Sequence, residues 1–121
     1  MEKLRGPEKL IRTTLGEYLA NGHEDIAGVY VIACYPQFGC IYIGQAKVSV
    51  YKRLRQHLGN VDEDLGPFLR CFMADACKFR LDILTPPNIK NKNEWIYQAE
   101  KALINYFNPW LNIGLNTPYP S

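Results

Sequence analysis

Three short segments of the chain have the hydrophobic pattern of β-strands. Residues 28–34 and 40–44 are rich in β-branched and aromatic side chains, which pack well on a pleated sheet, and Pro36 and Gly39 mark the loop between them. Two strands joined by so short a loop form an antiparallel hairpin. Residues 77–84 alternate between hydrophobic and polar positions and add a third strand. The pattern therefore predicts a small, mainly antiparallel, three-stranded sheet.

Helical spacing of apolar residues predicts helices that flank this sheet. Apolar side chains recur at every third or fourth position in residues 7–21, 49–58, 68–73 and 94–107. Pro109 ends the last of these segments. We therefore expect an α+β fold in which an N-terminal helical extension, residues 1–25, precedes one domain at residues 26–116 and a short irregular tail at residues 117–121.

The composition is that of a folded globular protein with one hydrophobic core. Of 121 residues, 47% are hydrophobic and 21% are charged, which excludes a disordered chain, and the length suits one domain. The sequence contains no stretch of about 18 apolar residues that would cross a membrane. Its amino-terminal segment also lacks the apolar run of a signal peptide. We expect a cytoplasmic protein that has no membrane partner.

The four cysteines do not have the spacing of a structural zinc site. Cys34 and Cys40 are separated by five residues, as are Cys71 and Cys77, whereas zinc sites use shorter spacings within each pair. In a reducing compartment these side chains act as small buried hydrophobic groups. A cross-strand disulfide between Cys34 and Cys40 is the alternative in an oxidising compartment.

Positive charge is concentrated in one part of the chain, although the net charge is only +2. Residues 26–61 contain no Asp or Glu but include Lys47, Lys52, Arg53 and Arg55. A basic helix face beside a neutral sheet is typical of a surface that binds a phosphate backbone. A solvated helix face explains the same charges equally well, so the charge suggests nucleic acid without establishing it.

Two pairs of residues around the hairpin are candidates for chemistry. If Tyr30 pairs with Tyr42 across the hairpin, the two phenols lie side by side on one face of the sheet, although tyrosine pairs in sheets commonly serve packing. Arg53 and His57 are four residues apart and share a helix face. Arginine suits phosphate oxygens and histidine transfers protons near neutral pH. A surface arginine and an incidental histidine are the alternative.

Glu100 is the most informative single residue. Its neighbours at helical spacing are Ile96, Leu103 and Ile104, and a carboxylate among apolar side chains costs several kcal/mol unless it is compensated. A cation or a divalent metal compensates it, whereas a position at the edge of the apolar stripe leaves it in contact with solvent. Asn112 follows the end of the same helix and is a polar residue in an apolar segment.

In their order and spacing these elements resemble the GIY-YIG nuclease domain. Gly28-Val29-Tyr30 is close to the GIY motif, and Tyr42-Ile43-Gly44 is a complete YIG motif. Arg53 with His57, then Glu100, and then Pro109 with Asn112 follow in the family's order, so the likeness covers residues 26–116. The resemblance implies a divalent-metal-dependent endonuclease that hydrolyses DNA phosphodiester bonds and uses one Mg²⁺ or Mn²⁺.

The resemblance also implies a role for each matching residue. Glu100 would hold the metal, and Tyr30 would help to activate the attacking water. Because a phenol is a weak base at neutral pH, positive charge must lie near it, and Arg53 is the expected source. Tyr42 would form hydrogen bonds in the same site, and His57 would accept or relay a proton.

The remaining expectations concern the frame of the site and its partners. Asn112 would brace the site, and Gly28 and Gly44 are structural glycines of the motifs. The residues expected to contact the DNA backbone are Lys47, Lys52 and Arg55. The expected partner is double-stranded or branched DNA, with a homodimer or a partner protein supplying specificity. A non-catalytic nucleic-acid-binding module with the same fold is the alternative, although the complete residue set favours catalysis.

Overall fold

The computed structural model describes residues 4–21, 24–35, 39–59, 78–109 and 111. In chain order its elements are β1 (Leu10–Thr14), α1 (Leu15–Asn21), β2 (Gly28–Cys34), β3 (Gly39–Ala46), α2 (Val50–Gly59), β4 (Arg80–Leu84) and α5 (Lys92–Phe107). The fold is therefore α+β, as predicted. None of the described helices is long and apolar enough to cross a membrane.

The sheet has four strands in the order β1-β4-β2-β3, and every neighbouring pair is antiparallel. The prediction of three strands was wrong because residues 10–14 form β1 rather than part of a helix. β1 pairs with β4 from Leu10 opposite Leu84 to Thr14 opposite Arg80, so it covers an edge that β4 would otherwise expose. Its β-branched residues, such as Thr13, favour this extended conformation.

The N-terminal helix is consequently shorter than predicted and begins at Leu15. The hydroxyl of Thr14 accepts a hydrogen bond from the backbone N–H of Glu17 at 3.2 Å, which is how a helix is capped at its first turn. Leu15 and Tyr18 are buried and fix α1 against the sheet.

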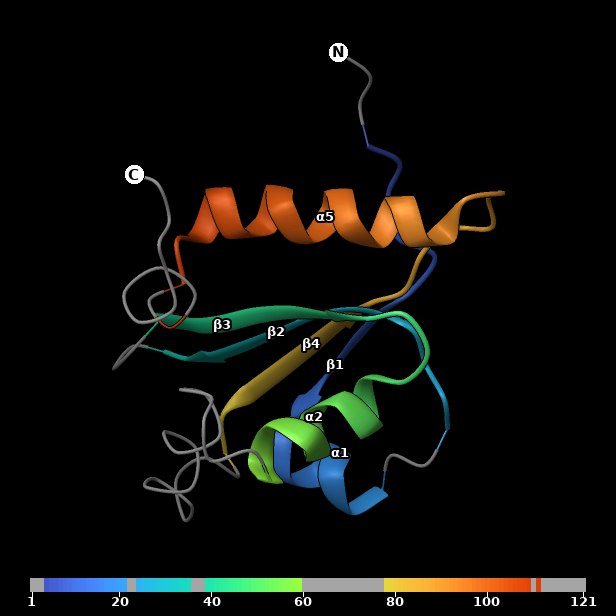
Figure 1. The fold of residues 1–121 in the computed structure, drawn as a ribbon. Coiled ribbons are helices and arrows are strands. Elements are labelled where there is room, and N and C mark those ends of the chain that lie inside the picture. The colour runs from blue at the N-terminus through green and yellow to red at the C-terminus, as the bar shows by residue number, and fades with distance from the viewer. Residues whose placement is uncertain (1–3, 22–23, 36–38, 60–77, 110, 112–121) are drawn as a thin grey trace.

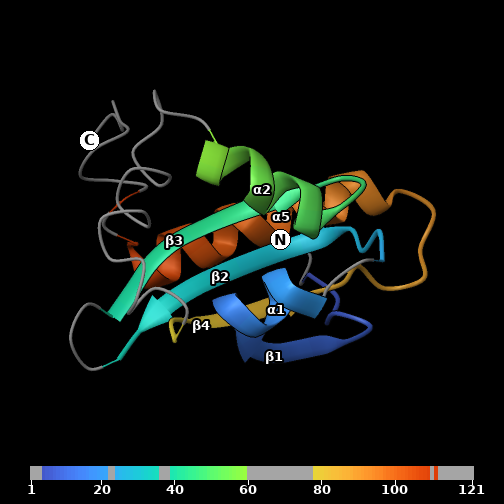
Figure 2. The same cartoon turned by 90° about the horizontal axis from the view of Figure 1, so that it is seen from below.

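Helices cover both faces of the sheet. α5 lies across one face, and α1 and α2 lie on the other (Figure 1). Seen from below, α2 lies along the β3 side of the sheet and α1 over the β4 and β1 side (Figure 2). Two hydrophobic cores result: one includes Tyr30 and Leu54 on the α1 and α2 face, and the other includes Ile43 and Ile96 on the α5 face.

The β2–β3 hairpin was predicted correctly, but its register was not. Tyr30 lies opposite Gly44, and Tyr42 lies opposite Ile32. The predicted pairing of Tyr30 with Tyr42 is therefore wrong, and a bulge between Ile32 and Ala33 shifts the register by one residue toward the turn. Such an extra residue cannot be read from side-chain type alone.

The other predicted elements agree with the structure where it describes them. α2 and α5 match the predicted helices, and β4 matches the third predicted strand except that it begins at Arg80, after a turn at residues 78–79. The side chain of Asn91 caps the start of α5 by accepting from the Glu94 N–H at 3.0 Å, and Asn108 adopts a left-handed conformation at its end. The predicted short helix at 68–73 and the tail at 117–121 lie outside the described residues.

Cys34 and Cys40 are not joined to each other by a disulfide. Cys34 packs against the core on the α1 and α2 face, and Cys40 belongs to the core on the α5 face. The alternative of a cross-strand disulfide does not fit this arrangement, because the two side chains belong to cores on opposite faces of the sheet. Cys71 and Cys77 lie outside the described residues.

Candidate active site

A buried tyrosine and a buried histidine form the centre of the candidate site. The hydroxyl of Tyr30 lies 2.7 Å from Nε2 of His57, within hydrogen-bond distance. Tyr30 lies on β2 and His57 lies on α2. The exposed fractions of the two residues are 0% and 1%. A hydrogen bond between two groups that are shielded from solvent holds both rings in fixed orientations.

Tyr42 joins this pair although it is not opposite Tyr30. Its ring centroid lies 5.3 Å from that of His57 and 6.3 Å from that of Tyr30. Tyr42 and Gly44 are two residues apart on β3, so both face α2. Tyr42 is half-buried, so it is the ring of this cluster that reaches solvent.

Gly44 is required by the position of Tyr30. A Cβ atom at residue 44 would overlap the Tyr30 hydroxyl, and the ring carbon Cζ would lie only 2.5 Å away. Gly28 is similarly restricted, since a Cβ there would meet the backbone of Leu84. Both motif glycines therefore allow close approaches within the sheet.

Glu100 lies on α5, on the other face of the sheet from Tyr30. Its carboxylate is half-buried and accepts a hydrogen bond from Nε2 of Gln45 at 2.8 Å. Burial raises the pKa of Glu100, while the hydrogen bond from Gln45 and the positive charge of Arg53 oppose this rise. The expected apolar surroundings are confirmed, because Ile96 and Ile104 are buried beside it.

The two halves of the site meet at the edge strand β3. Gly44 and Gln45 are consecutive residues, so the first supports Tyr30 on the α2 face and the second holds Glu100 on the α5 face. Arg53 links the halves, because it lies on α2 four residues from His57 and acts electrostatically on Glu100. Its Nη1 donates to Oε1 of Gln56 at 3.1 Å.

A cavity of about 420 Å³ opens where β3 leads into α2. It is lined by Gln45, Ala46, Lys47, Val48, Ser49, Lys52, Arg53 and Gln56. Three of these side chains are cationic and none is a carboxylate. Lys52 also lies 3.7 Å from Asp25 in an exposed pair, and such pairs contribute little. The cavity is therefore suited to an anion.

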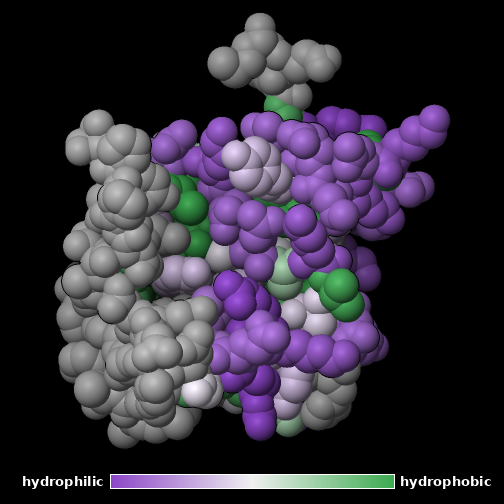
Figure 3. Space-filling view, viewed as in Figure 1, coloured by the Kyte–Doolittle hydropathy of each residue, from purple (hydrophilic) through white to green (hydrophobic). Residues whose placement is uncertain are grey.

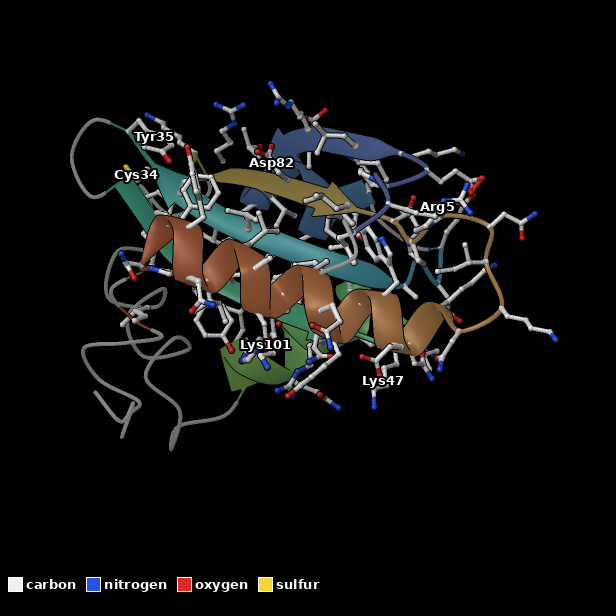
Figure 4. The ribbon with its side chains drawn as sticks, turned by 90° about the horizontal axis from the view of Figure 1, so that it is seen from above. Arg5, Cys34, Tyr35, Lys47, Asp82 and Lys101 are labelled. Atoms are coloured by element: carbon white, nitrogen blue, oxygen red, sulfur yellow. The ribbon has the colours of Figure 1, made fainter. Side chains whose placement is uncertain are left out.

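The surroundings of this cavity are polar. The face shown in Figure 3 is mostly hydrophilic where α5 and α2 lie. Lys47 and Lys101 both lie on the α2 side of α5 (Figure 4), and the ammonium of Lys101 lies 5.1 Å from the ring centroid of Tyr97. Lys101 therefore adds a further cation on the same side of α5 as Lys47.

The structure brings most of the predicted site residues into these two groups. Arg55 is an exception, because its guanidinium lies over the ring of Tyr51 at 5.9 Å and does not line the cavity. Asn112 lies outside the described residues. Among the described residues, no group of three or more His, Cys, Asp or Glu side chains is placed to hold a metal.

Sequence reasoning missed Gln45. Strand alternation contained the signal, because a residue directly after Gly44 must face the opposite side of the sheet. A polar side chain within the apolar run 40–46 therefore had to find a partner on the helix that covers that face.

Comparison of the chain with protein family models, with curated proteins and with solved structures found no match in any of the three.

Proposed function

We propose that this protein is a divalent-metal-dependent DNA endonuclease that hydrolyses phosphodiester bonds. The observation that carries the proposal is the arrangement around β3. A buried tyrosine–histidine pair lies on one face of this strand, a half-buried glutamate lies on the other, and a cavity with three cations opens beside them. Metal-dependent hydrolysis of a phosphodiester uses proton transfer, a metal ligand and anion binding together.

The residues around Glu100 fit a divalent metal. Mg²⁺ usually keeps several water ligands and binds through one or two carboxylates together with substrate phosphates, so a single glutamate beside an anion-binding cavity is a suitable donor. A second oxygen is close, because Gln45 contacts the same carboxylate. When bound, Mg²⁺ or Mn²⁺ would stabilise the negative charge that develops on the leaving 3′-oxygen.

Tyr30, His57 and Tyr42 would accept and hold the proton that the attacking water loses. Tyr30 and His57 are sealed from solvent and share a hydrogen bond, so they would hold the proton and fix the ring of Tyr42. Tyr42 is half-exposed, and a group that accepts a proton from water must come within hydrogen-bond reach of it. We assign the contact with the water to Tyr42.

Arg53 and the cavity lysines would bind and orient the phosphate. The guanidinium of Arg53 acts on Glu100 and lines the cavity with Lys47 and Lys52. Fixed positive charges at the place where negative charge develops in a transition state lower the barrier to reaction. Contacts to the phosphate backbone also predict binding that weakens as the salt concentration rises.

A plasmid assay tests this function. Supercoiled DNA is incubated with wild type, Glu100→Ala and the control Glu94→Ala, in Mg²⁺, in Mn²⁺ or in EDTA. Glu94 is an exposed carboxylate on the same helix, so its removal should leave cutting unchanged. Metal-dependent nicking that disappears only in Glu100→Ala is expected. Equal cutting by Glu100→Ala and wild type would contradict the assignment of the metal to Glu100.

A non-catalytic nucleic-acid-binding module is the second candidate. The complete burial of Tyr30 favours it, because a hydroxyl without solvent contact serves packing as well as chemistry. This candidate predicts that wild type binds DNA in the same assay without cutting it in either metal, and that removal of Lys47 and Lys52 weakens the binding.

A further inference from the structure

The amide of Gln45 is held at only one of its two ends. Its Nε2 donates to Oε1 of Glu100 at 2.8 Å, but its Oε1 is buried and has no hydrogen-bond partner in the part of the chain that the structure describes. A buried acceptor without a donor is unfavourable. Among the described residues, the Glu100 carboxylate is therefore the group that sets the orientation of this amide.

Rotation of the amide by half a turn would exchange its oxygen and its nitrogen. The two ends of a glutamine amide have nearly the same size and shape, so the rotation needs no new space. It breaks only the bond to Glu100, since no described residue holds Oε1. The backbone would not move, because Gln45 is fixed in β3 opposite Val29.

After this rotation, Gln45 and Glu100 would present two oxygens at the spacing that a metal requires. Mg²⁺ binds oxygens at about 2.0–2.1 Å in an octahedron, which places neighbouring ligand oxygens about 2.9 Å apart. The amide nitrogen and the carboxylate oxygen are already 2.8 Å apart. The attraction of a bound cation to both oxygens would outweigh the repulsion between them.

We propose that Gln45 is a second ligand of the divalent metal at Glu100 and that its amide rotates when the metal binds. Without metal, the NH₂ group donates to the carboxylate and neutralises part of its charge. With metal, the amide oxygen binds the ion next to the carboxylate oxygen. This inference rests on the proposed metal site at Glu100 and adds to it a ligand from β3, where Gln45 also lines the cavity.

Metal binding without DNA tests the proposal separately from activity. Mn²⁺ binding to the metal-stripped protein is measured by electron paramagnetic resonance of the free ion, for wild type, Gln45→Leu, Gln45→Glu and Glu100→Ala. Gln98→Leu is the matched control, because Gln98 donates to the exposed carboxylate of Glu94 at 2.7 Å on the same helix as Glu100. Circular dichroism confirms that each variant is folded.

The expected result distinguishes a ligand from a residue that only positions Glu100. Gln45→Leu should weaken Mn²⁺ binding at least tenfold, whereas Gln45→Glu keeps an oxygen and should bind Mn²⁺ as tightly as wild type or more tightly. If Gln45 acted only as a hydrogen-bond donor that competes with the metal for the Glu100 carboxylate, Gln45→Leu would bind Mn²⁺ at least as tightly as wild type. Glu100→Ala should not bind, and Gln98→Leu should match wild type.

Each contrary result has a separate meaning. Wild-type affinity in Gln45→Leu, with binding lost in Glu100→Ala, would overturn the role of Gln45 and leave the metal site intact. Weaker binding in Gln45→Glu would overturn ligation by the amide oxygen. A wild type that binds no Mn²⁺ would overturn the metal site itself, and the role of Gln45 with it.

Discussion

The hydroxyl of Tyr30 occupies the space that a side chain on Gly44 would need. The two residues pair across the β2–β3 hairpin, and the same hydroxyl lies 2.7 Å from Nε2 of His57. The glycine therefore determines where the tyrosine–histidine pair can form. Gln45 follows Gly44 directly in β3. The close contact of Gly44 with Tyr30 therefore also holds in place the part of β3 that contacts Glu100.

Gly44→Ala should destabilise the protein by about 1–3 kcal/mol, as expected when a methyl group is forced into a filled space. The methyl group would displace the Tyr30 ring and lengthen its contact with His57. The free energy of unfolding, measured by urea denaturation, tests this effect. Gly59→Ala is the control, because the added methyl group would meet no atom within 4 Å apart from its chain neighbours and the nearby backbone of its own helix. Equal stability of the two variants would show that the Tyr30 ring moves aside at no cost.

Tyr30→Phe should lower the free energy of unfolding by about 1–2 kcal/mol, because it removes a buried hydrogen bond and keeps the ring. It should also abolish DNA cutting while leaving DNA binding nearly intact, since Tyr30 has no exposed surface. Urea denaturation and the plasmid assay measure the two effects. Tyr106→Phe removes a hydroxyl from a residue that is 79% exposed, and it should change neither stability nor cutting.

Several parts of this fold follow from local sequence. The hairpin, α2 and α5 have clear strand or helix patterns, and the apolar neighbours of Glu100 are set by helical spacing alone. β1 could not be predicted in this way, because Leu10 and Leu15 also fit a helix. Pairing with β4, some 70 residues away, decides the conformation, and this pairing cannot be seen in a local window.

The candidate site was predictable in its residues but not in its contacts. The motif resemblance indicated Tyr30, His57 and Glu100, yet Gly44 rather than Tyr42 lies opposite Tyr30. This shift of two residues keeps Tyr42 on the same face of the sheet but changes its partner across the hairpin, and the length of the loop did not indicate it. The contact between Gln45 and Glu100 depends on how α5 packs on β3, which only the three-dimensional structure shows.

Cys40 should react slowly with iodoacetamide in the native protein. Burial raises the pKa of its thiol from 9.0 to about 11, and only the thiolate is a nucleophile. At pH 8 the thiolate fraction is then about 100-fold lower than for a thiol of ordinary pKa, since two pKa units correspond to two powers of ten. The rate should rise with pH until the pH approaches the raised pKa. Mass spectrometry of the peptide that contains Cys40 measures the rate.

Unfolding the protein supplies the control for this prediction. In concentrated urea the burial is lost, so Cys40 should react at the rate of an ordinary thiol. A native rate within a factor of about three of the rate in urea would contradict the burial of Cys40 at the end of the hairpin.

Arg53 and Arg55 are two residues apart on α2 but should differ in their contribution to DNA cutting. Arg53 lines the cavity and acts on Glu100, whereas Arg55 is exposed and lies over Tyr51. Arg53→Gln should lower the single-turnover cutting rate about 100-fold or more, as the loss of a charge that stabilises a transition state does. Arg55→Gln should change that rate less than threefold and should lower DNA affinity only modestly. Both variants remove one positive charge from the same helix, so a general loss of charge would slow them equally. An equal effect would therefore contradict the placement of Arg53 beside the reacting phosphate.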